Sequence, residues 1–268
     1  MKLTLLCFVL VPVLAQQPYR APRLKGTTHP NLTGLWQSLN EGNWDIQAHA
    51  AQPGPVAYGA LYAEPAGPGI VEGNHIPYQP WAIEKKKDNV AKRFTRVEVD
   101  GQRMEPLDPE AKCYLPGVPR ATYMPFPFQI IQGNDKIVLA YEFASATRTV
   151  HLDKVDPAPA ASYMGWSTGR WDGDTLAVDV TALNDKTWFD RAGNFHSDAL
   201  HVTERYMPVS ADVLRYQATM EDPKVFTRPW AIRFPLYRRL DANAQFLEFK
   251  CVPFAEEIVY GHLRKEQR

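Results

Sequence analysis

Side chains that can move protons are concentrated in residues 184–204, a polar stretch between two apolar runs. Histidine titrates near neutral pH, and a neighbouring carboxylate can orient its ring, so this composition fits acid–base catalysis without a cofactor. In this interpretation His196 and His201 carry protons, and Asp190 or Glu204 is the partner carboxylate. The candidate catalytic residues are His151, Asp190, His196, His201 and Glu204.

The same side chains have a structural alternative, in which they anchor the loop by satisfying backbone hydrogen-bonding groups. A metal site is disfavoured, because five residues along a straight strand would place His196 and His201 on opposite faces. Their spacing is neither His-x-His nor His-Glu-x-x-His, so no metal is predicted. The sequence has no P-loop, Rossmann fingerprint or serine nucleophile elbow, and no cofactor is predicted.

Arginine and aromatic side chains near these groups could bind a small, partly apolar molecule. A guanidinium group can hold a carboxylate or phosphate through two parallel hydrogen bonds, and aromatic rings can line an apolar pocket. The alternatives are structural ion pairs and ordinary core rings. The candidate ligand-binding residues are Tyr141, Arg148, Trp166, Arg170, Trp171 and Trp188.

Short strands separated by turn residues are expected to position these groups. Asp172-Gly173 is a strong hairpin signal, and Gly133-Asn134-Asp135 is a second turn. The pattern predicts strands at 129–131, 136–143, 148–153, 164–171, 175–180, 200–206, 213–221, 230–237 and 245–252. Little helical periodicity separates them, which indicates antiparallel connections.

Strands of this number favour a mainly β fold, a closed antiparallel up-and-down barrel of the lipocalin or calycin kind. Gly34-Leu35-Trp36 opens the first expected strand, and Gly-x-Trp is similar to the start of lipocalin-like barrels. In residues 213–221, apolar and polar side chains alternate, so one face of each strand is apolar. An apolar lumen with a solvated outside is favoured over a polar lumen wrapped by other elements.

The residues before the regular strands are rich in proline and glycine. We expect an extended lead-in at 16–33 and one barrel domain at 34–268, with an irregular cover at 40–127 and regular strands at 128–255. Aromatic residues within the cover indicate order, and the Pro80 to Arg93 stretch predicts a helix.

Residues 1–15 have a lysine near the start, an apolar core and small residues before a possible cleavage point, which is typical of a secretory signal peptide. No later run is long and apolar enough to cross a membrane. The sequence thus predicts an exported protein, periplasmic or secreted. Cys113 and Cys251 then remain, and an oxidising compartment favours a disulfide over two buried thiols.

The chain contains 30 Lys and Arg residues and 30 Asp and Glu residues, so its formal net charge is zero. This balance argues against nucleic acid as a partner. A small molecule is the expected partner, and the oligomeric state is open.

Three segments resemble a broad family of exported, mostly uncharacterised bacterial proteins. The first has the pattern Gly-x-Trp-x-Gly-Asp-Thr-Leu-x-Val at 169–178, the second is Cys-x-x-Pro-Gly-x-Pro-Arg at 113–120, and the third is Glu-Asp-Pro at 221–223 with Pro-Trp at 229–230. The resemblance spans residues 105–255 and implies export, but no particular activity.

Two classes of function therefore stay open. One is a cofactor-independent acid–base enzyme, a lyase, isomerase or hydrolase acting on a small, partly apolar substrate. The other is a carrier that holds an apolar ligand in the barrel. Barrels of this kind support both, so the fold alone does not decide.

Overall fold

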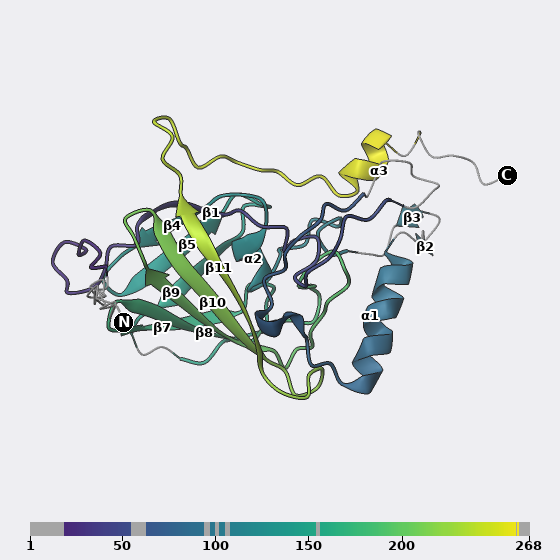
Figure 1. Ribbon diagram of the computed structural model, residues 1–268, viewed down its shortest axis with the longest axis horizontal. Coiled ribbons are helices and arrows are strands. Elements are labelled where there is room, and N and C mark those ends of the chain that lie inside the picture. Colours follow the sequence, from purple (N-terminus) through teal and green to yellow (C-terminus); the bar gives the residue numbers. More distant parts are fainter. Residues whose placement is uncertain are drawn as a thin grey trace, which may run out of the picture.

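A computed structural model describes residues 19–54, 63–93, 97–99, 102–104, 108–153, 156–260 and 262 (Figure 1). The predicted signal peptide at 1–15 lies outside the described residues. The described chain is mainly β, with a strand barrel at one end and helices and loops at the other (Figure 1).

The barrel is closed, in the order β1-β11-β10-β9-β8-β7-β6-β5-β4, with β4 pairing back to β1. Its strands are β1 (Gly34–Ser38), β4 (Phe128–Gln132), β5 (Lys136–Tyr141), β6 (Thr147–His151), β7 (Trp166–Asp172), β8 (Thr175–Thr181), β9 (His201–Pro208), β10 (Val213–Glu221) and β11 (Trp230–Arg238). The predicted lipocalin-like barrel is confirmed. Closure leaves no exposed edge on these strands.

One pair departs from a strictly antiparallel order. β6 and β7 run parallel, with Val150 opposite Ser167 and His151 opposite Thr168. A closed barrel with an odd number of strands cannot alternate direction at every neighbour, so one parallel pair is a geometric necessity. The chain between β6 and β7 must therefore cross from one end of the barrel to the other.

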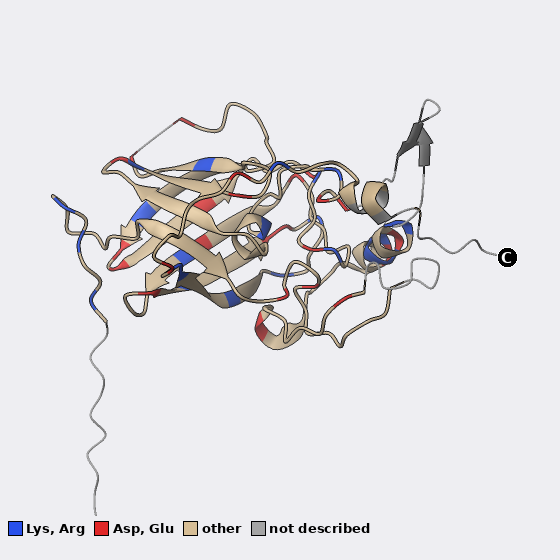
Figure 2. Cartoon of the chain, turned by 90° about the horizontal axis from the view of Figure 1, so that it is seen from above, with Lys and Arg blue, Asp and Glu red and all other residues tan. Residues whose placement is uncertain are grey.

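The inward face of β10 is apolar, as the alternation in residues 213–221 predicts. Leu214, Tyr216, Ala218 and Met220 of β10 are buried, whereas Arg215 and Glu221 are exposed. Figure 2 shows charged residues of both signs interspersed along the strands. Burial of the apolar face is the main force that holds the barrel together.

The two ends of the barrel differ. The end where β1 begins and β11 ends, called the floor, faces the lead-in at 19–33. The opposite end, called the mouth, lies beside the cover, which contains η2 (Glu72–Asn74), α1 (Pro80–Lys92) and α2 (Arg120–Tyr123). α1 confirms the helix expected from Pro80. The short pair β2 (Val97–Val99) and β3 (Gln102–Met104) also belongs to this region.

The predicted strand at 245–252 is wrong. Residues 239–252 leave β11 and run as an extended arm along the outside of the molecule to α3 (Ala255–Tyr260) (Figure 1). The barrel closes through β1 instead, so no place in the sheet is left for this segment. The Cys113 and Cys251 sulfur atoms lie at bonding distance, 2.00 Å, which ties the arm to the cover as the cysteine pair predicted.

No helix in the described part of the chain is long and apolar enough to cross a membrane.

Candidate functional site

The centre of the lumen holds a buried ion pair between Arg148 on β6 and Glu204 on β9. The two terminal guanidinium nitrogens of Arg148 lie 2.6 and 2.9 Å from the two carboxylate oxygens of Glu204. Both side chains are at most 2% exposed. β7 and β8 separate the two strands in the sheet, so the pair spans the lumen. Such bidentate geometry gives the strongest form of charged hydrogen bond.

Tyrosines complete this network. The hydroxyls of Tyr206 and Tyr216 donate to Glu204 over 3.0 and 2.7 Å, and Arg148 Nε donates to the Tyr141 hydroxyl over 3.2 Å. Burial, together with the charge of Glu204, raises the pKa of Tyr206 and Tyr216, so both stay neutral. The Arg148 and Glu204 side chains thus find their hydrogen-bond partners inside the lumen.

Within the described residues, the three histidines of the acid–base prediction contact different partners. His151 stacks on Trp166, with ring centroids 4.6 Å apart. His201 is half-buried on the outer wall, and its Nε2 lies 3.4 Å from the Asp179 carboxylate. His196 is buried in the loop beneath the cover.

His196 is held as a neutral ring. Its Nδ1 is 2.9 Å from the Ser197 carbonyl oxygen, so this nitrogen must donate. Its Nε2, 2.7 Å from the Thr187 hydroxyl, then accepts the hydroxyl proton. Burial lowers the pKa of His196, which favours the same neutral form. This geometry matches the loop-anchoring alternative.

Asp190 is fully buried between the cover and the mouth. It accepts hydrogen bonds from the Ile46 N–H (2.9 Å), the Asn194 N–H (3.1 Å) and Asn194 Nδ2 (2.5 Å). Asn194 Nδ2 also lies 3.4 Å from the Asp45 carboxylate, so one amide bridges two acids. Burial, and then the charge of Asp45, raises the pKa of Asp190 to about 7.

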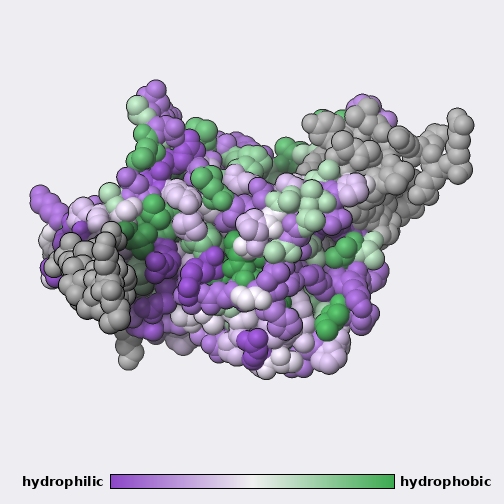
Figure 3. Space-filling model, viewed as in Figure 1, coloured by the Kyte–Doolittle hydropathy of each residue, from purple (hydrophilic) through white to green (hydrophobic). Residues whose placement is uncertain are grey.

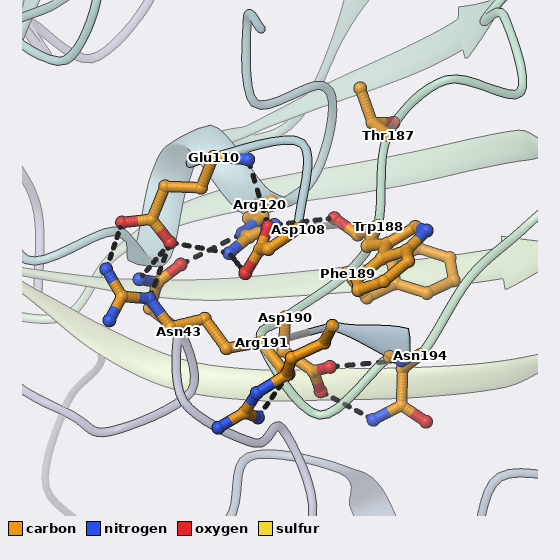
Figure 4. Close-up of polar contacts among 12 residues, drawn as sticks. Asn43, Asp108, Glu110, Arg120, Thr187, Trp188, Phe189, Asp190, Arg191 and Asn194 are labelled. Atoms are coloured by element: carbon orange, nitrogen blue, oxygen red, sulfur yellow. Dashed lines mark hydrogen bonds and ion pairs between the residues drawn. The ribbon is translucent and has the colours of Figure 1, made fainter. Parts of the chain in front are cut away.

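A second buried ion-pair network, absent from the sequence prediction, joins the cover to this loop (Figure 4). Arg120 donates to both oxygens of Asp108 (3.0 and 3.2 Å) and to Glu110 (2.8 Å). Arg191 then makes two 2.8 Å hydrogen bonds to Glu110. Burial alone would raise the pKa of Glu110, but Arg191 and Arg120 outweigh it and lower this pKa to about 2.

The remaining candidate ligand residues are dispersed. Arg170 pairs with Asp179 on the outer wall over 2.6 Å, and Trp171 stacks on His29 of the lead-in, with centroids 4.9 Å apart. Trp188 packs beneath the cover, where its carbonyl accepts from Arg120 over 3.4 Å. Of the predicted site residues, Tyr141, Arg148 and Glu204 share one network.

No group of three or more His, Cys, Asp or Glu side chains in the described residues is arranged to hold a metal ion.

A pocket of about 180 Å³ lies at the floor, where the lead-in meets the start of β1, the end of β11 and the turn between β9 and β10. Its walls include Tyr19, Leu32, Trp36, Ser210, Leu214 and Arg238. The Arg238 guanidinium lies over the Trp36 ring, 4.3 Å from its centroid, and donates to the Thr33 carbonyl over 2.9 Å. A Cβ at Gly34 would meet this guanidinium, which would have to move aside.

The sequence pointed to Trp36 as part of a lipocalin-like first strand but not to the pocket. Its walls come from residues 19–36 and 208–238, which are distant in the chain and meet only when β1 pairs with β11. Neither segment carries a motif for binding.

Comparison of the chain with protein-family models, curated proteins and solved structures finds no match. The resemblance to exported bacterial proteins therefore stays a prediction. Its motif residues have architectural roles here: Gly173 adopts φ +58° at the β7–β8 turn, and Asp222 accepts from the Ser197 N–H over 2.7 Å.

Proposed function

We propose that the chain is an exported binding protein that holds a small, partly apolar molecule in the floor pocket. The observation that carries this proposal is the make-up of the pocket wall. Trp36, Leu32 and Leu214 supply apolar surface, while Asn31, Ser210 and Arg238 at the wall can each donate a hydrogen bond. Concave apolar sites with a few polar groups are the usual form of ligand pockets.

The donor character follows from bonds already made within the protein. The Asn31 side-chain oxygen accepts from the Thr33 N–H over 3.0 Å, which leaves its NH₂ group to donate. Ser210 Oγ accepts from the Asp212 N–H over 3.3 Å, which leaves its hydroxyl proton. Arg238 can only donate, and two of its five N–H groups already donate to the Ala211 and Thr33 carbonyls, which leaves the others for a ligand. A ligand with a carboxylate or carbonyl acceptor is the best complement.

The size of the pocket limits the ligand. An apolar cavity of roughly 150 Å³ is known to hold benzene, so a volume of about 180 Å³ suits a molecule with a single ring and a small acceptor group. The lumen is a poorer candidate, because the large side chains of Tyr206, Tyr216 and Phe128 are fully buried inside it. We therefore place the ligand in the floor pocket and not inside the barrel, where the carrier interpretation of the sequence expected it.

Export is supported by the signal-peptide pattern and by the cysteine pair. Disulfides persist in oxidising compartments, and the Cys113–Cys251 geometry suits one, with Cα atoms 5.6 Å apart.

The test uses three ring probes of similar size: benzoate, benzamide and benzylamine. NMR shift changes at the Trp36 indole and the Ser210 amide would report binding at the floor. We expect benzoate and benzamide to bind and benzylamine not to bind. Arg238→Met should weaken benzoate roughly tenfold or more, since a hydrogen bond to a charged group is lost, and Ser210→Ala should weaken it less without touching Trp36.

Arg170→Met on the outer wall is the matched control, since it removes an arginine that does not line the pocket and should leave binding unchanged. Equal binding of all three probes, or binding insensitive to both Arg238→Met and Ser210→Ala, would contradict the proposal.

Acid–base catalysis is the second candidate, and one observation favours it. Asp190 combines burial, a neighbouring carboxylate and a pKa of about 7, which is the pattern of a proton-transfer group. The argument against this candidate is that three N–H groups already donate hydrogen bonds to the Asp190 carboxylate. Turnover that disappears in Asp190→Asn but persists in His196→Ala would support this candidate.

A further inference from the structure

The C-terminal arm, residues 239–252, carries large apolar side chains on the surface. Leu240 is 69% exposed, Leu247 61% and Val252 56%, and Phe246 is also exposed. Figure 3 shows apolar residues among polar ones on the projection that Figure 1 draws as the bend of this arm. Single exposed apolar residues are ordinary, but a series along one extended segment is typical of an interaction surface.

The arm is attached to the rest of the molecule at residues 247–251, where the Phe249 ring packs on Phe126 and Phe143, with ring centroids 4.6 and 5.6 Å apart. Cys251 is tied to Cys113, and the Leu247 N–H donates to the Glu142 carboxylate over 2.8 Å. A single bridge joins Phe249 to Phe143. Within the described part of the chain, no strand pairs with the opposite edge of the arm. Such an edge can accept another strand.

We propose that a second copy of this chain covers the arm, by antiparallel pairing of the two arms around a two-fold axis at Phe249. In this register Glu248 of one copy lies opposite Lys250 of the other, and the two-fold axis makes this pair twice. Phe246 lies opposite Val252, also twice. The arm is thus complementary to itself in charge and in apolar surface.

Three observations favour a second copy over another occupant. Glu248 and Lys250 already lie 3.4 Å apart within one arm. In the dimer each side chain can therefore pair with the other residue type in the second copy, and neither charge is left unpaired. The chain has zero formal net charge, so like-charge repulsion does not oppose self-association. An anionic lipid surface would need a basic arm, whereas Asp241 and Glu248 balance Arg239 and Lys250.

The experiment measures the mass of the full mature chain by sedimentation across a concentration series. We expect a dimer. Glu248→Lys alone places lysines opposite each other, and Lys250→Glu alone places glutamates opposite each other. Each should weaken the dimer roughly tenfold or more, because two opposite-charge pairs become like-charge pairs. The double variant Glu248→Lys/Lys250→Glu restores both pairs and should restore the dimer.

Lys87→Glu, an exposed charge reversal on α1, is the control and should not change the mass. Unchanged circular dichroism confirms folding of every variant. A monomer at all concentrations, or a double variant no better than either single one, would overturn the proposal. So would a monomer whose arm binds lipid vesicles.

Discussion

Arg148 and Glu204 show how much depends on single buried charges in this barrel. Each side chain is almost fully removed from water, and each has its partner and the surrounding tyrosines as compensation. Removing one partner leaves the other charge buried and unpaired, whereas an exposed pair is screened by solvent and contributes little.

Glu204→Gln should therefore lower the free energy of unfolding by about 3–5 kcal/mol. Chemical denaturation at pH 7 would measure it. Arg170→Ala, which breaks the exposed pair with Asp179, should cost less than about 1 kcal/mol. The double variant Arg148→Met/Glu204→Leu should recover much of the loss, and a double variant less stable than Glu204→Gln would contradict this account.

Asp190 should make stability depend on pH. Its pKa is about 7 in the folded protein against an ordinary value of 3.8, so the folded state holds this proton more tightly than the unfolded state. The resulting stability is present in full below pH 3.8 and is lost as the pH rises through 7. In Asp190→Asn, the free energy of unfolding should no longer fall between pH 4 and 8 on account of this group. This expectation holds even if the substitution also changes stability by an amount that does not depend on pH.

Asp45→Asn serves as the companion variant. It removes the neighbouring charge that raises the pKa of Asp190, so the loss of stability should move to lower pH. A slope that is identical in both variants and in the unaltered protein would show that another group is responsible.

His196→Ala should behave as a structural substitution. It breaks the bonds to Thr187 and Ser197 beneath the cover, and loss of a buried hydrogen-bonded group typically costs about 1–3 kcal/mol. The melting temperature should fall while benzoate binding at the floor stays unchanged. An unaltered melting temperature together with lost activity would instead restore the catalytic interpretation.

At the scale of elements, the sequence predicts the features that are determined by residues close together in the chain, such as the buried face of a strand or a hairpin turn. The period-2 alternation in β10 predicts which face is buried, and Asp172-Gly173 predicts the β7–β8 turn. Pairing between distant segments is not encoded in this way. Nothing in residues 245–252 shows that β1 takes their place in the sheet, and nothing in Glu110 alone shows that two distant arginines neutralise it.

The cover depends on that second network. Arg120→Met would leave Asp108 with no arginine and Glu110 with one, both buried against the loop at the mouth. We expect amide exchange in residues 40–54 and 108–123 to accelerate, because local opening follows the weakest attachment. Exchange in β9 and β10 should change little. Equal acceleration in cover and barrel would mean that the cover is not a separate unit of stability.

At the scale of the whole molecule, the two ends of the barrel differ: the floor has the candidate ligand pocket, and the mouth has the buried cluster around Asp190. The floor pocket involves Arg238 at the end of β11, while the Asp190 cluster lies beneath the cover near Trp230, where β11 begins. A strand of 9 residues spans roughly 30 Å. No shared side chain connects the two groups through their described contacts, so binding at the floor and titration at the mouth should be independent.

A double-mutant cycle tests this independence. Effects on unfolding free energy at sites this far apart normally add within about 0.5 kcal/mol. Asp190→Asn and Arg238→Met should therefore be additive, and Asp190→Asn should leave the benzoate dissociation constant unchanged at pH 5 and at pH 8. A coupling well above that limit would mean that the packed lumen transmits a change between its ends. The Arg148–Glu204 network, which spans the lumen, would then be the first place to look for the link.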